Sequence, residues 1–273
     1  MSKFLLFGYG SIGHRHTQNL RRLRPAAQLV IADPYCIQPG PRQLFYRDWR
    51  RALSDHGDAD GAIIASPTSE HLTQLLAADH AGISVYVEKP LLTVADYRQL
   101  AAEQLLTGLP LDARHVCGFQ YLFHAAMPTV ERLARQCGEL TFAGSDDLLG
   151  RYGRDVEGMM VAHPIATALR LFGPAFGVHL HSDGVRLAGH VYHQSGGVSH
   201  YDFAMDRGPR ESWVRAGGRE VALGPSDNMY LDCMASWLDF IEGGPRDSRL
   251  SSVSEGVAVT QILAQVARVE AMV

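Results

Sequence analysis

The segment GYGSIG, at residues 8–13, constrains the fold of this chain more than any other. It matches the pattern G-x-G-x-x-G, with the apolar run KFLLF before it and the helical pattern IGHRHTQNLRRL following. Gly8 permits the tight turn, Gly10 lets the backbone approach a diphosphate, and Gly13 lets the helix pack closely on the strand. A diphosphate would lie at the N-terminus of that helix. The residues expected to hold it are Gly8, Gly10, Ser11, Ile12 and Gly13.

Asp33 supplies the second half of this pattern. It ends the apolar run QLVIAD, twenty residues after Gly13, where a carboxylate can accept hydrogen bonds from the adenosine ribose hydroxyls. A carboxylate there repels a 2'-phosphate, and the next residues, Pro34 and Tyr35, offer no arginine to neutralise one. The sequence therefore predicts NAD as the cofactor, with NADP the less favoured alternative.

The first half of the chain alternates apolar runs with helical patterns. QLVIADP, GAIIASP and ISVYVEKP are typical of strands, and HLTQLLAADHAG between the last two is typical of a helix. Near-continuous apolar strands separated by helices indicate a parallel sheet covered on both faces. A helix in TVADYRQLAAEQLLTG and a short strand in HVCGF complete the layer. Residues 1–119 are therefore predicted to form an α/β domain with a doubly wound Rossmann sheet.

The pattern changes after residue 119. AAMPTVERLARQCGEL predicts a helix that ends at glycine, and TFAGSDDL predicts a strand. Between residues 177 and 223, short alternating runs separated by glycine-rich turns are typical of an antiparallel sheet. Helical patterns return in NMYLDCMASWLDFIEGG and SVSEGVAVTQILAQVARVEAMV. Residues 120–273 are therefore predicted to form a second, α+β domain.

Composition narrows the class of partner. The formal net charge is -4, which provides no broad basic field and argues against nucleic acid or an anionic membrane as the main partner. No apolar run near the N-terminus is long enough for a signal peptide, and none reaches the roughly 18 residues of a membrane span. We therefore expect a cytoplasmic protein that acts on a small molecule.

Cysteine and histidine spacing does not predict a metal site. The four cysteines lie far apart without a C-x-x-C pair, and we expect them to be reduced thiols. Several histidines gather in the strand-rich region, where no carboxylate or cysteine has matching spacing, so we interpret them as sheet residues. They are His179, His181, His190, His193 and His200.

Three further stretches narrow the prediction. ASPTSEHL at residues 65–72, VYVEKPL at 85–91 and GFQYLFHAA at 118–126 follow GYGSIG in order. With this spacing the chain resembles the Gfo/Idh/MocA family of NAD(P)-dependent oxidoreductases over nearly its whole length, most strongly up to Gln120. The pattern G-x-G-S-I-G-x-R-H-x-x-N-L is most similar to members from surface-sugar and sialic-acid-type pathways.

The resemblance implies a Rossmann domain followed by a domain with an open, mostly antiparallel sheet, through which such proteins form homodimers or homotetramers. It also implies hydride transfer between NAD(P) and a carbon of a sugar, cyclitol or nucleotide-sugar. Lys89 is the implied catalytic group, because an ammonium beside the nicotinamide can stabilise negative charge on the reacting oxygen. The remaining cofactor contacts it implies are Ser66, Pro67, Thr68 and His71 for adenine and ribose, Glu88, Lys89 and Pro90 near the nicotinamide ribose, and Gln120 near the nicotinamide.

His163 lies in the apolar segment GMMVAHPIATALRLFG and is the second catalytic residue that the resemblance implies. The sequence departs from the family's pattern nearby, because Met159, Ala166 and Leu122 occupy positions that are usually polar. His163 is therefore either the base that handles the substrate hydroxyl or a buried core histidine. Asp155 or Glu157 could supply the missing acid, and Tyr121, Tyr152 or Arg154 could supply the missing sugar contacts.

Three functions follow from these residues. The first is a dehydrogenase for a secondary alcohol or ketone of a sugar-like substrate. The second is a reductase of an imine or keto group on a less polar molecule, which the apolar residues around His163 suit. The third is a non-catalytic NAD-binding sensor, against which the E-K-P sequence argues, since a sensor has no chemical need for Lys89.

Overall fold

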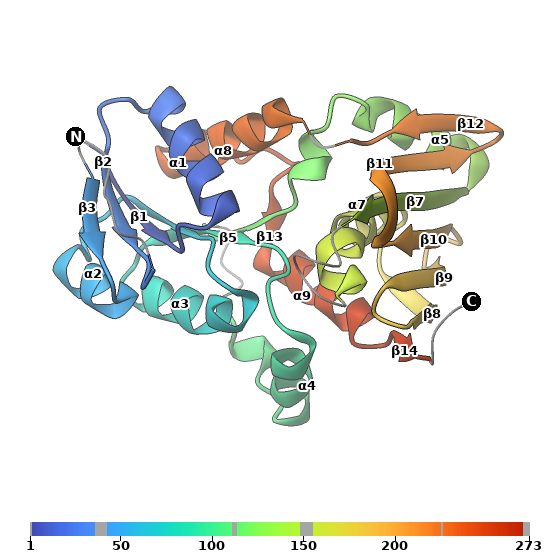
Figure 1. Ribbon diagram of the computed structural model, residues 1–273, viewed down its shortest axis with the longest axis horizontal. Coiled ribbons are helices and arrows are strands. Elements are labelled where there is room, and N and C mark those ends of the chain that lie inside the picture. The colour runs from blue at the N-terminus through green and yellow to red at the C-terminus, as the bar shows by residue number, and fades with distance from the viewer. Residues whose placement is uncertain (1, 36–42, 111–113, 148–154, 225, 270–273) are drawn as a thin grey trace. The chain divides into compact units, whose positions relative to one another are not determined.

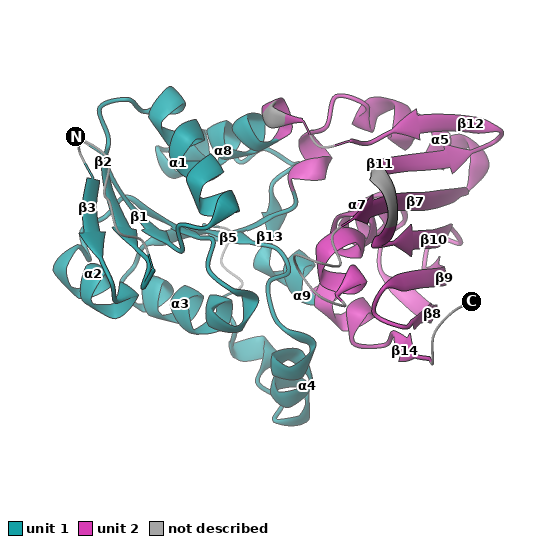
Figure 2. Ribbon diagram, in the orientation of Figure 1, with its two compact units in different colours: residues 1–119, 230–257 teal, residues 120–229, 258–273 magenta. Residues whose placement is uncertain are grey.

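The computed structural model describes residues 2–35, 43–110, 114–147, 155–224 and 226–269 (Figure 1). The chain forms two compact units (Figure 2). The first consists of Met1–Phe119 and Tyr230–Val257, and the second of Gln120–Met229 and Ala258–Val273. The chain thus passes from the first unit to the second after Phe119, and residues 230–257 return to the first unit.

The first unit is built on a seven-stranded sheet with the order β13-β6-β5-β4-β1-β2-β3. All its pairs are parallel except that of β13, which is antiparallel to β6. The doubly wound parallel sheet predicted from the sequence is confirmed. Its strands are β1 (Lys3–Phe7), β2 (Gln28–Ala32), β3 (Gln43–Tyr46), β4 (Gly61–Ile64), β5 (Ser84–Glu88), β6 (Val116–Gly118) and β13 (Ser251–Ser252).

Helices connect these strands and cover the sheet (Figure 1). Residues 4–7 of β1 are fully buried, which matches the continuous apolar run that predicted the strand. Strand β3 and helix α2 were not predicted, because β3 is only four residues long and the seven residues of α2 mix charged with apolar side chains. The helices are α1 (Ser11–Leu23), α2 (Trp49–Asp55), α3 (Thr68–His80), α4 (Val94–Ala102) and a 3-10 turn (Leu106–Gly108).

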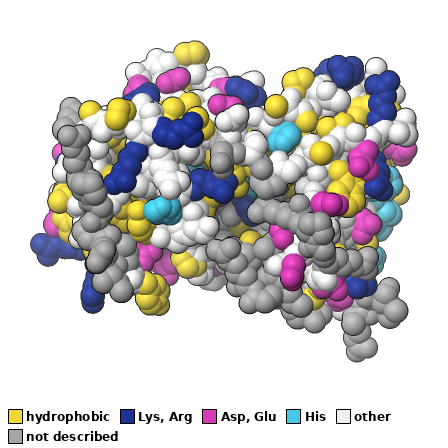
Figure 3. Space-filling view, turned by 45° about the horizontal axis from the view of Figure 1, so that its top comes forward, with side chains coloured by type: hydrophobic (Ala, Val, Ile, Leu, Met, Phe, Trp, Pro, Cys, Tyr) yellow, Lys and Arg dark blue, Asp and Glu magenta, His cyan; other side chains and the backbone are white. Residues whose placement is uncertain are grey.

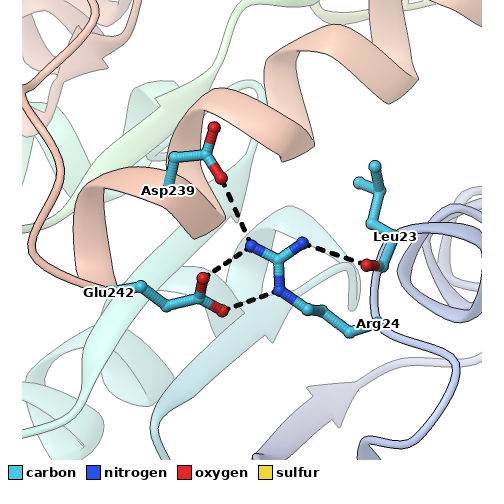
Figure 4. Close-up of polar contacts among 4 residues, drawn as sticks. All are labelled: Leu23, Arg24, Asp239 and Glu242. Carbon is cyan, nitrogen blue, oxygen red and sulfur yellow. Dashed lines mark hydrogen bonds and ion pairs between the residues drawn. The ribbon is translucent and has the colours of Figure 1, made fainter.

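Helix α8 (Asp227–Ile241) returns the chain to the first unit. Trp237 on this helix is fully buried, and its ring centroid lies 6.2 Å from that of Phe4 and 5.7 Å from that of Tyr86. At the end of α1, Arg24 donates hydrogen bonds of 2.7 and 2.6 Å to the carboxylate of Glu242 (Figure 4). These contacts explain why residues 230–257 do not belong to the second unit.

The second unit contains a seven-stranded sheet with the order β12-β11-β7-β10-β9-β8-β14. Most of its pairs are antiparallel, as predicted, but β7 with β10 and β8 with β14 are parallel. The end of the chain, for which we expected a helix throughout, contributes β14 after α9 ends. The strands are β7 (Glu139–Asp147), β8 (Ala175–Ser182), β9 (Arg186–His193), β10 (Val198–Ala204), β11 (Asp206–Ala216), β12 (Arg219–Ala222) and β14 (Ala267–Arg268).

Most helical segments of the second unit come before its long hairpins, and the end of α9 follows them. The predicted helix before Gly138 is α5 (Met127–Cys137), and the segment around His163 forms a π-helical turn (Glu157–Val161) followed by α7 (Ala162–Phe172). The remaining helices are a 3-10 turn (Gln120–Phe123) and α9 (Val253–Leu263), which begins in the first unit and ends in the second.

The two faces of the second sheet differ in burial. Alternate residues on the central strands are buried, including Phe142, Leu187 and Phe203. On the other face, His179, His190 and His200 stand in register on neighbouring strands. This row is half-buried to exposed, and exposed aromatic side chains lie beside it. One face of the sheet therefore belongs to the core, while the other is left open by the part of the chain that the structure describes.

Candidate dinucleotide and catalytic site

The three glycines of the first turn are required for different reasons. Gly8 has a φ of 89°, and a Cβ there would lie 2.6 Å from the carbonyl oxygen of Ala65. A Cβ on Gly13 would collide with the carbonyl oxygen of Gly8. A Cβ on Gly10, in contrast, would meet nothing within 4 Å. Packing within the protein thus explains Gly8 and Gly13, whereas the space above Gly10 fits the approach of a ligand.

Helix α1 begins next to this space. Gly10 is its N-cap and provides no side chain to cap the helix, and Ser11 at the first helical position is exposed. The amide groups of the first turn have no acceptor within the helix, and the helix dipole adds positive potential there. Ser11, Ile12 and Gly13 therefore present backbone donors where a diphosphate would be bound.

The glycine turn lies at the point in the sheet where the connections between strands change direction. From β1 the chain continues to β2 on one side, while β4 pairs with β1 on the other. Ligands of doubly wound sheets bind at such a switch point, outside the carboxyl ends of the strands. The loops after β1 and β4 touch there, since a Cβ on Gly8 would lie 2.6 Å from Cα of Ser66.

Asp33 lies just after β2 and binds the glycine turn. One carboxylate oxygen accepts a 2.7 Å hydrogen bond from the amide of Tyr9, and the other accepts a 2.8 Å bond from the amide of Tyr35. The side chain is half-buried, so part of the carboxylate remains accessible. Asp33 is thus oriented by the turn that would carry the diphosphate, at the position expected to face the adenosine ribose.

The segment after β4 carries the next expected contacts. Pro67 caps helix α3, Thr68 is its first residue, and the Ser66 hydroxyl donates a 2.7 Å hydrogen bond to the side chain of Gln74. His71 is buried within the unit, with Nδ1 2.9 Å from the carbonyl oxygen of Pro90 and Nε2 2.9 Å from that of Ser66. Burial lowers the pKa of His71, although the two carbonyl groups oppose this effect.

Strand β5 ends in Glu88, Lys89 and Pro90. The carboxylate of Glu88 is buried and lies 2.6 Å from Nε2 of His16 on helix α1. Its other oxygen accepts a 3.3 Å hydrogen bond from the amide of Lys89. Lys89 is half-buried at the carboxyl end of the strand. Glu88 thus contacts protein groups on both sides, and Lys89 follows it at the carboxyl edge of the sheet.

His16 is not among the site residues that the sequence predicts. It is completely buried, on the face of α1 that includes Gly13, Thr17 and Leu20. A histidine in the middle of a buried helix face needs a polar partner, and this is the signal that could have identified it. That partner is Glu88, the first residue of the E-K-P sequence.

In the second unit, His163 stacks on Tyr121. The ring centroids are 4.4 Å apart and the planes differ by 2°. His163 is 7% exposed and Tyr121 is 8% exposed. Leu122 and Ala166 are also buried, as is Gln120. The structure therefore places the histidine among apolar and aromatic groups, where a charged form is disfavoured unless a partner compensates for it.

The two acids considered as partners for His163 have other contacts. Asp155 accepts a 3.1 Å hydrogen bond from the amide of Gly158 at the start of the π-helical turn. Glu157 is buried, with a carboxylate oxygen 2.9 Å from a guanidinium nitrogen of Arg268 on β14. Tyr152 and Arg154 lie outside the described residues.

Other classes of site are not evident in the described parts of the chain. No group of three or more His, Cys, Asp or Glu side chains within them is arranged to hold a metal ion. In the row of sheet histidines, the rings of His179 and His190 stack with centroids 5.1 Å apart. A search of the same residues finds no helix with the length and hydropathy of a membrane span.

Comparison with known proteins agrees with the site in the first unit. The model of the Gfo/Idh/MocA oxidoreductase family, described by its NAD-binding Rossmann fold, matches residues 2–105. The NAD(+)-dependent scyllo-inositol 2-dehydrogenase of Bacillus subtilis is 32% identical over 107 residues. This match covers 37% of the chain and only 31% of that enzyme.

Solved structures extend the likeness in fold to the whole chain. The WlbA (WbpB) dehydrogenase of Thermus thermophilus, solved with NAD and UDP-GlcNAcA, has a TM-score of 0.76 and 18% identity. This alignment covers 100% of the chain and 97% of the dehydrogenase. A myo-inositol dehydrogenase of Corynebacterium glutamicum has a TM-score of 0.72 at 20% identity, covering 96% and 94% of the two chains. Residues 2–105 therefore match the Gfo/Idh/MocA oxidoreductase family, and the solved structures extend the likeness in fold to the rest of the chain.

Proposed function

We propose that this protein is an NAD-dependent oxidoreductase that transfers a hydride between nicotinamide and a secondary alcohol or ketone. The observation that carries the proposal is the free space around a Cβ on Gly10, at the switch point of the sheet and the start of α1. Asp33 adds a ribose acceptor that disfavours NADP, and Lys89 adds an ammonium group at the same edge. A phosphate-binding turn alone would not require that lysine.

Each residue has a defined task in this proposal. The amides of the first α1 turn bind the diphosphate, and Asp33 orients the adenosine ribose. Bound NAD supplies the carbon that accepts or releases the hydride. Lys89 hydrogen-bonds the reacting oxygen of the substrate and stabilises its developing negative charge. His163 exchanges the hydroxyl proton, with its ring held flat by Tyr121.

The proposed substrates are sugars, cyclitols and nucleotide-sugars. The names of the similar proteins support this class, since they include inositol dehydrogenases and a dehydrogenase solved with UDP-GlcNAcA. The burial of Leu122 and Ala166 favours a second candidate, the reduction of a keto or imine group on a less polar molecule. In that case Lys89 donates the proton while hydride is delivered.

Two measurements test the proposal. NADH and NADPH binding is followed by nicotinamide fluorescence, and oxidation or reduction of a panel of inositols, sugars, nucleotide-sugars, ketones and imines is followed by nicotinamide absorbance. We expect the wild type to bind NADH and turn over at least one compound. Lys89→Ala should abolish turnover while the NADH dissociation constant changes by less than about fivefold. NADH binding without consumption would instead indicate the sensor, and unchanged turnover in Lys89→Ala would reject the role of that lysine.

We also propose that the protein forms a homodimer or homotetramer through the open face of its second sheet. That face bears Phe176, which is 70% exposed, and Tyr192, which is 38% exposed, with their rings stacked 6.1 Å apart. Exposed aromatic side chains next to half-buried histidines are typical of a surface covered in an assembly. Light scattering should give the mass of two or four chains, and Tyr192→Glu should reduce it.

The proposed partners are otherwise small molecules. On the face drawn in Figure 3, the described Lys and Arg side chains lie scattered among acidic and apolar ones, which is unlike a nucleic-acid surface. We propose the cytoplasm as the compartment, because the cysteines in the described residues are free thiols.

A further inference from the structure

The backbone on each side of Lys89 is held by a buried histidine of the same unit. Before it, the Glu88 carboxylate lies 2.6 Å from Nε2 of His16. After it, the carbonyl oxygen of Pro90 lies 2.9 Å from Nδ1 of His71. His16 is fully buried and His71 is 1% exposed, so in this structure both side chains are surrounded by protein groups.

The contact before Lys89 links it to the diphosphate helix. His16 belongs to α1, one turn after the amides that would bind the diphosphate. One carboxylate oxygen of Glu88 contacts Nε2 of His16, and the other accepts a hydrogen bond from the amide of Lys89. The rings of Tyr86 and His16 meet edge to face, with their centroids 5.2 Å apart. This contact restricts rotation of the imidazole. Helix α1 and the backbone of Lys89 are thereby joined through a single carboxylate.

The contact after Lys89 links it to the loop that follows β4. His71 lies in the first turns of α3, and its two ring nitrogens reach the carbonyl oxygens of Pro90 and Ser66. Ser66 is the residue that touches the glycine turn. A neutral imidazole donates to only one of these carbonyl groups, and with the proton on Nδ1 it holds that of Pro90, while the ring lies between the loops after β4 and β5.

We propose that His16 and His71 are positioning residues that together set where the Lys89 side chain leaves the backbone. This rests on the proposed function, in which Lys89 must reach the reacting oxygen. Hydrogen bonds to buried charged or carbonyl groups keep their geometry because breaking one leaves an unsatisfied buried group. A displacement of about 1 Å at a reacting group lowers the rate on the order of 100-fold. Two anchors on adjacent residues limit such displacement.

Amide side chains provide matched variants. Asn has its amide near the position of Nδ1 and Gln near that of Nε2. His71→Asn therefore retains the bond to Pro90, and His71→Gln retains only the bond to Ser66. Likewise, His16→Gln retains the bond to Glu88, and His16→Phe removes it. We expect kcat to fall by about 10- to 100-fold in His71→Gln and His16→Phe. We expect His71→Asn and His16→Gln to stay within about threefold of the wild type, and all four to bind NADH within about threefold.

The lysine content of the chain provides a readout that does not depend on activity. The chain has only two lysines, Lys3 and Lys89. Lys3 lies at the start of β1, with Nζ 2.6 Å from a carboxylate oxygen of Asp58. Carbon-13 labelling of lysine therefore gives two ε-methylene resonances in the NMR spectrum of the protein without cofactor. We expect the Lys89 resonance to move in His71→Gln and His16→Phe but not in the two conservative variants. The Lys3 resonance should stay constant throughout.

The outcomes separate this proposal from the proposed function. If the Lys89 resonance and kcat are unchanged in His71→Gln and His16→Phe, the positioning role is wrong. The same conclusion follows if only the thermal midpoint falls while the Lys89 resonance stays in place. If the wild type turns over no compound but the Lys89 resonance moves as expected, the positioning holds and the enzymatic proposal fails. If His16→Phe does not fold, the comparison of His71→Gln with His71→Asn tests the positioning role.

Discussion

The imidazole of His163 lies parallel to the phenol ring of Tyr121, with 4.4 Å between the ring centroids. A stacked ring keeps one orientation, which a proton-transfer group requires and which a core histidine could equally have. The same geometry is therefore compatible with both interpretations of this histidine. Substitutions that separate packing from proton transfer distinguish them.

His163→Ala should lower kcat by about 100-fold or more, the usual contribution of a general base. Tyr121→Phe retains the stacked ring and should leave kcat within about threefold, while Tyr121→Leu should lower it because the imidazole loses its support. Steady-state rates at saturating NADH measure this, with NADH affinity as the control. A His163→Ala protein with the wild-type rate would show that His163 is a core residue and not the base.

The contrast between Gly10 and Gly13 predicts two different phenotypes. Gly10→Ala adds a methyl group where no protein atom lies within 4 Å, so the free energy of unfolding should stay near that of the wild type. The NADH dissociation constant should rise at least about tenfold, because the methyl group fills the diphosphate space. Gly13→Ala meets the carbonyl oxygen of Gly8 and should destabilise by about 3 kcal/mol. Calorimetry measures NADH binding, and urea unfolding measures stability. If Gly10→Ala loses both binding and stability, the space next to Gly10 is not open to a ligand.

Asp33→Asn tests the choice of cofactor. The amide oxygen can still accept the hydrogen bond from Tyr9, so the glycine turn should keep its shape. The negative charge is lost, which weakens the bond to the adenosine ribose and removes the repulsion of a 2'-phosphate. The ratio of NAD to NADP affinity should fall by about 10- to 100-fold. Parallel titrations with NADH and NADPH measure the ratio, and an unchanged ratio would show that Asp33 does not face the ribose.

The sequence predicted the Rossmann sheet well because its local signals agree. Strand β1, the glycine turn and Asp33 each carry the residue pattern that their position requires, and no distant contact is needed to recognise them. The place of helix α8 could not be predicted in this way. Its apolar side chains fit any core, and only the contacts of Trp237 with Phe4 and Tyr86 assign it to the first unit. The partnership of His16 with Glu88 was missed for the same reason, since 72 residues separate them.

Two contacts of helix α8 should contribute very differently to stability. Trp237→Ala removes a fully buried indole and should cost about 3–5 kcal/mol. Arg24→Ala removes partly exposed ion pairs with Asp239 on α8 and with Glu242 just after it, where solvent weakens the attraction, and should cost less than about 1 kcal/mol. Urea unfolding measures both changes. A large effect of Arg24→Ala with a small effect of Trp237→Ala would show that the ion pairs, and not the buried indole, hold this helix.

The pH dependence of stability should reveal the buried histidines. Burial lowers the pKa of His71 and of His193 below the ordinary value of 6.5, so the folded protein binds fewer protons than the unfolded chain at mildly acidic pH. Their contribution to stability is therefore complete above about pH 6.5 and is lost as the pH falls below it. The hydrogen bond from Arg249 lowers the pKa of Asp247 to about 2, so that carboxylate loses its contribution only as the pH falls below its unfolded pKa of about 4.

Urea midpoints measured from pH 7.5 to pH 5.0 should thus decrease with acidity before any carboxylate titrates. His71→Asn cannot bind the proton and should make the decrease smaller. His80→Asn is the matched control, because His80 is exposed at the end of the same helix and should leave the decrease unchanged. If His71→Asn retains the full wild-type decrease, the acid sensitivity belongs to other groups, and a neutral His71 held between the carbonyl groups of Ser66 and Pro90 is ruled out.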